Sequence, residues 1–181
     1  HVNRIYDLTR FFLDRTAFGE GLSEQEKEQI SMAAIMHDVG KIAVPKEILY
    51  KPARLSEEEF EEVKKHVDYG YDILHNSPGE IIQIAADIAQ QHHERYDGRG
   101  YPSGLTGENI PIYAKIASVA DSFDAMTSDR QYRKGMPIEQ AKDEIIRNIG
   151  TQFDGDVARA FVTILERDTD IILNEAMNLG K

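Results

Sequence analysis

Apolar residues recur at helical spacing along most of the chain. The segments that carry this spacing are 30–34, 60–74, 81–88, 116–123, 138–149 and 157–165. Residues three and four positions apart lie on the same face of an α-helix, so each segment predicts a helix with one buried face. No segment shows a convincing alternation of apolar and polar residues, which is typical of a half-buried strand. The pattern therefore predicts an all-α fold, a helical bundle of about seven to nine helices.

Three of the predicted helices begin with the sequence of a capping box. In this motif a serine side chain accepts a hydrogen bond from the first turn, and a glutamate three residues later accepts one from the serine N–H. The pairs are Ser23 with Glu26, Ser56 with Glu59, and Ser77 with Glu80. Pro78 would then occupy the first helical position, where its missing N–H costs nothing.

Glycine and proline gather in two connections, at residues 40–54 and 95–113. The first connection is the main basic region of the chain, with Lys41, Lys46, Lys51 and Arg54 against the single acid Glu47. The second is an irregular stretch of 19 residues. Loops longer than about 12 to 15 residues inside a compact domain are usually functional or disordered. We therefore expect the second connection to contribute to a functional site.

The charge of the chain limits the partners that it can bind. Its 21 Lys and Arg stand against 32 Asp and Glu, which gives a formal net charge of −11 over 181 residues. Such a surface repels polyanions, so we expect no binding to polymeric nucleic acid or to anionic lipid. A phosphate-bearing substrate would need a local cationic site.

Several other features of the composition point to a domain from the cytoplasm. The longest apolar run, Met32 to Met36, is too short for a membrane span, which needs about 20 residues. The absence of cysteine excludes disulfides, thiolate nucleophiles and thiolate metal ligands, and it fits the cytoplasm. The sequence begins at His1 without Met and shows no signal peptide, so we expect residues 1–181 to be one domain of a longer chain.

Two of the six histidines lie where the helical pattern predicts a buried residue. His37 extends the apolar face of the segment 30–34, and His92 extends that of the segment 81–88. Adjacent residues on a helix point about 100° apart. The pairs His37-Asp38 and His92-His93 are therefore suited to helix ends that face a cluster wider than one ion. His75 is turned away from His66 by about half a revolution, and we expect it to be structural or exposed to solvent.

Asp121 supports the hypothesis of a metal cluster. A helix through this residue aligns it with small residues on one face, namely Ala114, Ala117, Ala125 and Ser128. A buried carboxylate is expensive without a cation or donors, and small neighbours let other helices bring ligands close. The alternative is an aspartate that pairs with an arginine.

Imidazole and carboxylate ligands without thiolates are suited to Mn, Fe, Co, Ni or Zn. Two such ions about 3.5 to 4 Å apart can share a bridging hydroxide and hold the attacking and leaving oxygens of a phosphoester displacement. The five histidines that remain without His75 and the two aspartates exceed the needs of one ion. They would suffice for two.

Five motifs, in order along essentially the whole chain, carry a resemblance to a known family. They are H-x-x-R at 1–4, H-D-V-G-K at 37–41, H-x-x-x-G at 66–70, H-H-E-R-Y-D-G-R-G-Y-P at 92–102 and D-x-x-D-A-M-T-S-D-R at 121–130. The chain resembles the HD-GYP subgroup of the HD-domain phosphohydrolases, bacterial enzymes that degrade cyclic di-GMP. The resemblance implies a single HD-domain bundle with a long loop around Gly100, Tyr101 and Pro102.

The resemblance also implies a metal site with two divalent ions, most often iron or manganese. The first ion would be held by His1, His37, Asp38 and Asp121. The second would be held by Asp38, His66, His92 and His93, so that Asp38 bridges the two ions. Some relatives hold a third metal through a carboxylate one turn before the first histidine, which here would precede His1.

The reaction implied by the resemblance is hydrolysis of cyclic di-GMP to pGpG, with GMP as a further product. A hydroxide between the ions, held at Asp38, would attack phosphorus. Lys41 would contact the scissile phosphate or assist proton transfer, Tyr101 would stack on guanine or contact phosphate, and Arg130 and Arg133 would bind phosphate. A regulatory domain upstream in the full chain and a protein partner at the loop are further features of the family.

Two alternatives remain open on the sequence. The same metal site can serve another cyclic dinucleotide or a nucleotide phosphoester, since the ligands do not encode the base. A module that binds cyclic di-GMP or a partner protein without turnover would be favoured by missing ligands, and none is missing here.

Overall fold

The computed structural model describes residues 2–129 and 134–168, and the described residues form nine α-helices and three short 3-10 helices. The first part of the chain contains α1 (Val2–Arg15), η1 (Ala17–Gly19), α2 (Glu24–Ile35), η2 (Met36–Ala43), α3 (Lys46–Leu49), α4 (Glu57–Lys64) and α5 (His66–Leu74). The second part contains α6 (Glu80–Gln91), η3 (Gly107–Asn109), α7 (Ile112–Thr127), α8 (Ile138–Arg147) and α9 (Gly155–Arg167). The prediction of an all-α fold is confirmed.

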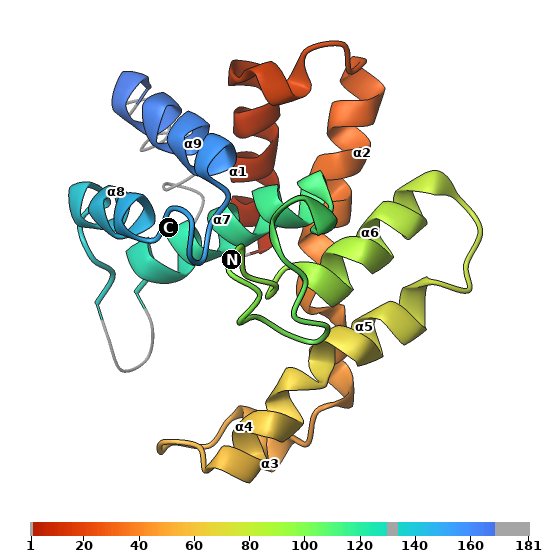
Figure 1. Ribbon diagram of the computed structural model, residues 1–181. Coiled ribbons are helices and arrows are strands. Elements are labelled where there is room, and N and C mark those ends of the chain that lie inside the picture. Colours follow the sequence, from red (N-terminus) through yellow and green to blue (C-terminus); the bar gives the residue numbers. More distant parts are fainter. Residues whose placement is uncertain (1, 130–133, 169–181) are drawn as a thin grey trace.

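Helix α7 runs through the middle of the molecule and packs on both of its apolar clusters (Figure 1). One cluster joins α7 to α1, α8 and α9, with Phe123 stacked edge-on against Phe161 at a centroid distance of 5.5 Å. The other cluster joins α7 to α2 and α6 through small residues such as Ala85 and Ala117. The small side chains let these helices approach α7 closely, as the pattern around Asp121 predicts.

Two of the three predicted capping boxes are present. Ser23 with Glu26 and Ser56 with Glu59 form both hydrogen bonds of the motif. The prediction at Ser77 is wrong, because α6 begins after Gly79 instead. Gly79 has a φ of +118°, a conformation that side chains with a Cβ rarely adopt, and it separates the Ser-Pro pair from the helix.

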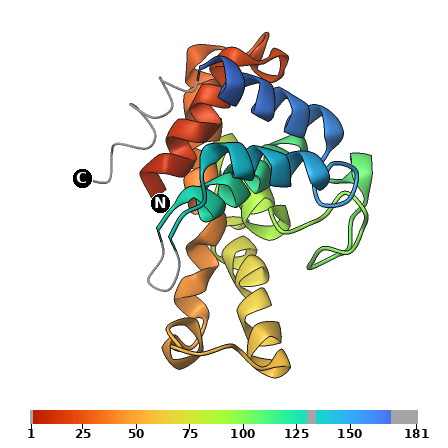
Figure 2. The same cartoon turned by 90° about the vertical axis from the view of Figure 1, so that its left-hand side faces the viewer.

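Helices α3 and α4 form an arm that projects from the helical body (Figure 2). The apolar spacing over 60–74 predicts one helix, but the chain breaks at Lys65 into α4 and α5. The break directs α5 onto η2 and α6, while α4 packs against α3 in the arm. Consequently His66 is the first residue of a helix and lies at its buried end.

The long connection before α7 is irregular, as expected. Its features are a backbone bridge between Asp97 and Thr106 and the short helix η3, and α7 begins at Ile112. The arm and this loop both line one cavity, to which α4 contributes Phe60 and Lys64 and the loop contributes Arg99, Gly100 and Tyr101. Within the described part of the chain, none of the helices is both long enough and apolar enough to cross a membrane.

Candidate metal centre

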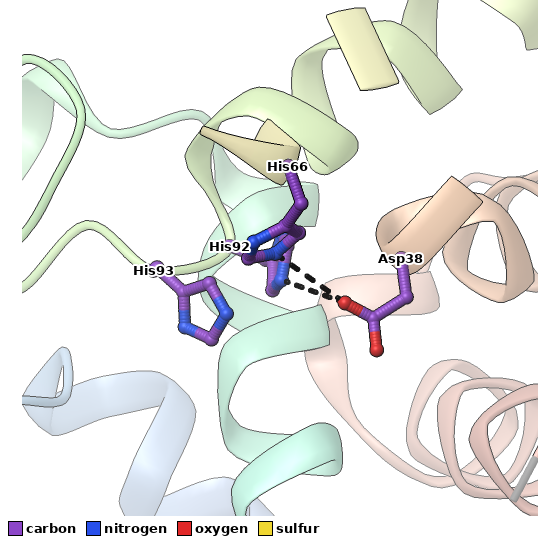
Figure 3. Close-up of side chains that lie close together, drawn as sticks. All are labelled: Asp38, His66, His92 and His93. Atoms are coloured by element: carbon purple, nitrogen blue, oxygen red, sulfur yellow. Dashed lines mark ion pairs between the residues drawn. The ribbon is translucent and has the colours of Figure 1, made fainter. Parts of the chain in front are cut away.

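Asp38 of η2 faces His66 at the start of α5 and the histidine pair that follows α6 (Figure 3). Its Oδ2 atom is 3.4 Å from Nε2 of His37. Its Oδ1 atom is 3.4 Å from Nε2 of His66 and 3.9 Å from Nε2 of His92. The two oxygens of one carboxylate therefore face two different sets of ligands.

The first set consists of His37 and Asp121. Nε2 of His37 lies 3.7 Å from Oδ1 of Asp121, which reaches it from α7. The family resemblance implies that His1 belongs to the same set, but His1 lies outside the residues that the structure describes. The described members of the set thus meet at the Oδ2 side of Asp38.

The second set consists of His66, His92 and His93, together with Asp38 itself. Each residue offers one ligand atom, and these atoms all lie within 4.8 Å of one another. His92 caps the C-terminal end of α6, and its ring is tilted by 43° from that of His93. The turn at the end of the helix brings two adjacent histidines to one cluster, as their position in the sequence predicts.

A glycine allows η2 and α5 to approach closely enough to form this cluster. A Cβ atom added to Gly40 would lie 1.9 Å from the carbonyl oxygen of His66 and 2.3 Å from the backbone N of Gly70. Any side chain at residue 40 would therefore separate the two helices. The glycines of the H-D-V-G-K and H-x-x-x-G motifs meet here and fix the distance from Asp38 to His66.

Three of the histidine rings are oriented by backbone carbonyls. Nδ1 of His37 lies 2.8 Å from the Ala34 oxygen, and Nδ1 of His66 lies 2.7 Å from the Val63 oxygen. Nδ1 of His92 lies 3.0 Å from the oxygen of Ile88. A carbonyl can only accept, so Nδ1 carries the hydrogen and Nε2 of the neutral ring presents its lone pair to the cluster.

Burial keeps most of these histidines neutral. Desolvation lowers the pKa of His66 and of His92, and it lowers that of His93 to about 3. For His37 the carboxylates of Asp38 and Asp121 outweigh burial and raise the pKa. Neutral imidazole is the form that binds a metal ion, so three ligands are in that form without any proton loss.

The two aspartates differ in their electrostatic environment. Burial by itself would raise the pKa of Asp38, but hydrogen bonding and attraction from His37 and the charge of Lys41 hold it well below its usual range. Burial raises the pKa of Asp121, and the nearby Asp38 carboxylate adds to this effect. Asp38 is thus the permanently ionised ligand at the centre, and a cation would favour ionisation of Asp121.

The donor set fits divalent metal ions. Among the described residues, Nε2 of His66, Nε2 of His92 and Oδ1 of Asp38 are buried and have no hydrogen-bond partner. Leaving such polar atoms unsatisfied costs about 1 to 3 kcal/mol each, whereas a bound cation would satisfy all three. The combination of imidazole nitrogen and carboxylate oxygen is suited to Fe, Mn or Zn.

Lys41 and Tyr101, the other predicted site residues that the structure describes, lie beside the cluster. Nζ of Lys41 donates to Oδ2 of Asp38 at 2.5 Å, and the lysine side chain is 38% exposed. The ring of Tyr101 stacks on His93 at a centroid distance of 4.8 Å, and Nζ of Lys64 lies 5.6 Å above it. Arg130 and Arg133 lie outside the described residues.

A cavity of about 460 Å³ opens over the cluster, and we name it the metal cavity. His92, His93 and Asp121 lie in its wall, and Lys64, Arg95 and Arg99 add three cationic side chains. The wall also contains the carboxylate of Glu94, and Arg95 pairs with Asp97 at 3.0 Å, so three cationic side chains and two carboxylates line a cavity in an acidic chain. His75, in contrast, is not among the histidines of the cluster. Its ring stacks on Tyr71 at 4.6 Å.

An ion pair between α1 and α7, which the sequence patterns did not predict, supports the site next to Asp121. Nε of Arg4 lies 2.6 Å from Oδ1 of Asp124, which is buried one turn after Asp121, and Nη2 of Arg4 donates to Oγ1 of Thr127. The expected alternative of an aspartate paired with an arginine therefore applies to Asp124. Both partners belong to motifs of the sequence. Arg4 is the arginine of H-x-x-R, and Asp124 is the second aspartate of D-x-x-D.

A second missed residue is Glu94, which holds the long loop in place. Its side chain is buried and accepts hydrogen bonds from the backbone N–H groups of Ser103 at 2.7 Å and Leu105 at 2.9 Å. A Cβ at Gly100 would lie 2.5 Å from the oxygen of His93, so the loop folds back directly onto the histidine pair. These contacts position Tyr101 on His93.

Comparisons with known proteins agree with this geometry. A family model described as HD domain matches residues 9–157. A cyclic di-GMP phosphodiesterase of Thermotoga maritima is 45% identical over 161 residues, which cover 89% of this chain and 44% of the relative. The 3'3'-cGAMP-specific phosphodiesterase 2 of Vibrio cholerae is 40% identical over 154 residues, which cover 85% of this chain and 29% of the relative.

The fold is also similar to a solved structure. An HDG"Y"P protein from Bdellovibrio bacteriovorus aligns with a TM-score of 0.65 and 20% identity, over 89% of this chain and 51% of that one. At this identity the match shows a shared fold. The chain spans less than half the length of either curated relative.

Proposed function

Because the chain belongs to the HD-GYP subgroup of the HD-domain family, we propose that it is a metal-dependent phosphodiesterase that hydrolyses cyclic di-GMP to pGpG and onward to GMP. The observation that carries the proposal is the position of Asp38. Its two carboxylate oxygens face separate sets of buried nitrogen and oxygen ligands. A carboxylate shared by two sets of ligands is suited to hold a pair of adjacent ions, which can act together on a phosphoester.

His37, Asp38 and Asp121 would hold one ion together with His1, and Asp38, His66, His92 and His93 would hold the other. Such ions, iron or manganese in our proposal, would polarise the scissile phosphate and lower the pKa of a water molecule. A third ion is compatible with a ligand before His1.

The remaining side chains would bind and orient the substrate. Lys64, Arg95 and Arg99 line the metal cavity and would attract the phosphates against the net charge of the chain. Tyr101, fixed on His93, offers a flat face for a guanine ring. Lys41 is partly exposed and next to Asp38, so its ammonium can reach the scissile phosphate and supply a proton to the leaving oxygen. Arg130 and Arg133 would add further phosphate contacts.

A second candidate substrate is 3'3'-cGAMP. The relatives divide between cyclic di-GMP and 3'3'-cGAMP, and each named enzyme is at least 40% identical to this chain. Both substrates present the same phosphodiester groups to the metal ligands. The preference for one substrate therefore depends on the groups that contact the bases.

The test is a turnover assay on anaerobically prepared protein loaded with ferrous iron or manganese. We expect linear product from cyclic di-GMP, and a loss of at least about a thousandfold in kcat/KM for Asp38→Ala, as for removal of an essential catalytic group. His75→Gln is the matched control, because it alters a histidine outside the cluster. Absence of turnover of cyclic di-GMP and of 3'3'-cGAMP with either metal would contradict the proposal. Binding of a cyclic dinucleotide without turnover would instead identify the protein as a binding module.

A further inference from the structure

A second cavity adjoins the metal cavity along α7. It has a volume of about 470 Å³, similar to the metal cavity, and both volumes lie in the usual range for small-molecule sites. The two cavities share Ser122, Ala125 and Gln152 in their walls. The side-chain amide of Gln152 donates to Oγ of Ser122 at 3.3 Å, and this hydrogen bond connects two of the three shared residues. The two cavities therefore meet at these three residues, and a ligand that occupies both would lie across this shared wall.

The lining of the second cavity differs from that of the metal cavity in charge. Among the residues that the structure describes, Glu144 of α8 is its one ionisable lining residue, accompanied by the amide of Asn148 and the apolar side chains of Met126 and Phe153. A carboxylate repels phosphate, so the phosphates of a dinucleotide would remain beside the cations of the metal cavity. Apolar walls with a few polar groups are suited to a flat nucleobase.

We propose that the second cavity, here called the Glu144 cavity, binds the nucleobase remote from the scissile phosphate and that Glu144 selects guanine there. The proposal rests on the proposed function, since it assumes a cyclic dinucleotide in the metal cavity. The Glu144 side chain is 40% exposed, and Arg147 donates to its Oε1 atom from the next turn of α8. This contact leaves Oε2 and a second lone pair of Oε1 to accept from a ligand.

The chemistry of the two purines explains the selection. The Watson–Crick edge of guanine presents two donors side by side, N1–H and the 2-amino group, which match the two oxygens of a carboxylate. Adenine presents one donor, the 6-amino group, beside an acceptor at N1, so it could donate to only one carboxylate oxygen and would set its N1 lone pair against the other. A site built to form hydrogen bonds with one base rejects an analogue that lacks the matching groups.

This selection has a consequence for mixed substrates. Cyclic di-GMP supplies guanine to the Glu144 cavity in either orientation. The substrate 3'3'-cGAMP does so in only one orientation, which brings only one of its two phosphates to the metal ligands. The protein would then open 3'3'-cGAMP at one phosphate and release one of the two possible linear isomers.

The first measurement is calorimetric binding of non-hydrolysable phosphorothioate analogues of cyclic di-GMP and cyclic di-AMP to manganese-loaded protein. We expect Glu144→Ala to weaken binding of the guanine analogue about tenfold, as for a lost hydrogen bond to a charged group, and that of the adenine analogue less than about twofold. Asp143→Ala is the matched control, because it removes an equal charge from an exposed neighbour on the same helix that does not line the cavity. It should change neither affinity.

The second measurement is the ratio of linear isomers formed from 3'3'-cGAMP. We expect one isomer from the wild-type protein and both from Glu144→Ala. Equal losses for the two analogues, the same loss in Asp143→Ala, or a mixture of isomers from the wild type would overturn the inference. Guanine-selective binding without turnover would reject the proposed function alone, and turnover without selectivity would reject the Glu144 cavity alone. Absence of both binding and turnover would reject both.

Discussion

Two regions of this molecule bury their side chains by different means. Around α1, α8 and α9, apolar residues such as Phe12 and Phe161 pack on one another and on α7. Around η2, α5 and α6, the chain instead buries three histidines beside Asp38. The first region is filled by its own apolar side chains. In the second, Nε2 atoms of His66 and His92 have no hydrogen-bond partner among the described residues, so a bound cation would stabilise this region.

The largest effect is expected from Gly40→Val. This substitution disrupts the close contact between the backbones of η2 and α5 in the histidine-containing region. The new side chain would collide with the backbone of His66 and Gly70, so we expect the free energy of unfolding to fall by more than about 4 kcal/mol. Urea denaturation of the metal-free protein measures the loss. Ile42→Ala, at a position that is 83% exposed, should cost little. Equal stability of the two variants would show that the contact between η2 and α5 is dispensable.

A slightly smaller effect is expected in the apolar region from Phe161→Ala. The ring is buried against Phe12 and Phe123, and its removal should cost about 3 to 4 kcal/mol through lost burial and a residual cavity. Because the variant leaves the ligands in place, the additional stability that manganese provides should equal that of the wild type. Denaturation with and without the metal measures both quantities, and loss of the metal effect would show that the two regions are coupled.

Metal addition should stabilise the protein through the polar region. Binding only to the folded state predicts a gain of about 2.7 kcal/mol when free metal is one hundred times its Kd. His66→Ala removes a ligand nitrogen and should lower this gain at the same metal concentration, whereas His75→Gln should retain it. Thermal unfolding across a manganese titration measures the difference. The same gain in both variants would place the ions elsewhere.

The smallest effect is expected from Asp154→Ala at the start of α9. Asp154 accepts from the N–H groups of Asp156 and Val157 and lies 3.1 Å from Nζ of Lys115, so its loss should cost about 1 kcal/mol near pH 7. Burial opposes these contacts, yet they lower the pKa of Asp154 overall. A lowered pKa stabilises the folded state above the unfolded value of 3.8, and this contribution is lost as the pH falls through the folded value. The difference between wild type and variant should therefore vanish in acid, and a constant difference would contradict the assignment.

Much of the site could be predicted from the sequence because polar residues interrupt apolar patterns there. His37 and His92 stand at positions where the helical spacing requires burial, and both are buried. Asp121 was expected to face other ligands because small residues surround it, and its Oδ1 lies near His37. Helical spacing likewise excluded His75, which the structure places on Tyr71.

Other features depend on contacts that are distant in sequence and could not be read from local patterns. The pairing of Arg4 with Asp124 joins α1 to α7 across the whole chain. The carboxylate of Glu94 bonds forward to the loop, although its position gives no helical signal. The capping prediction at Ser77 failed because the backbone geometry of Gly79 overrides a favourable local sequence.

Counting the bound metal tests most directly whether Asp38 joins two ligand sets. Elemental analysis of anaerobically loaded protein, combined with a manganese titration, should give two ions per chain for the wild type. Removing one ligand of the second set, as in His92→Ala, should reduce the count to one. Asp38→Ala should lose both ions at concentrations that saturate the wild type. Retention of one ion with wild-type affinity in Asp38→Ala would contradict a carboxylate shared between two ions.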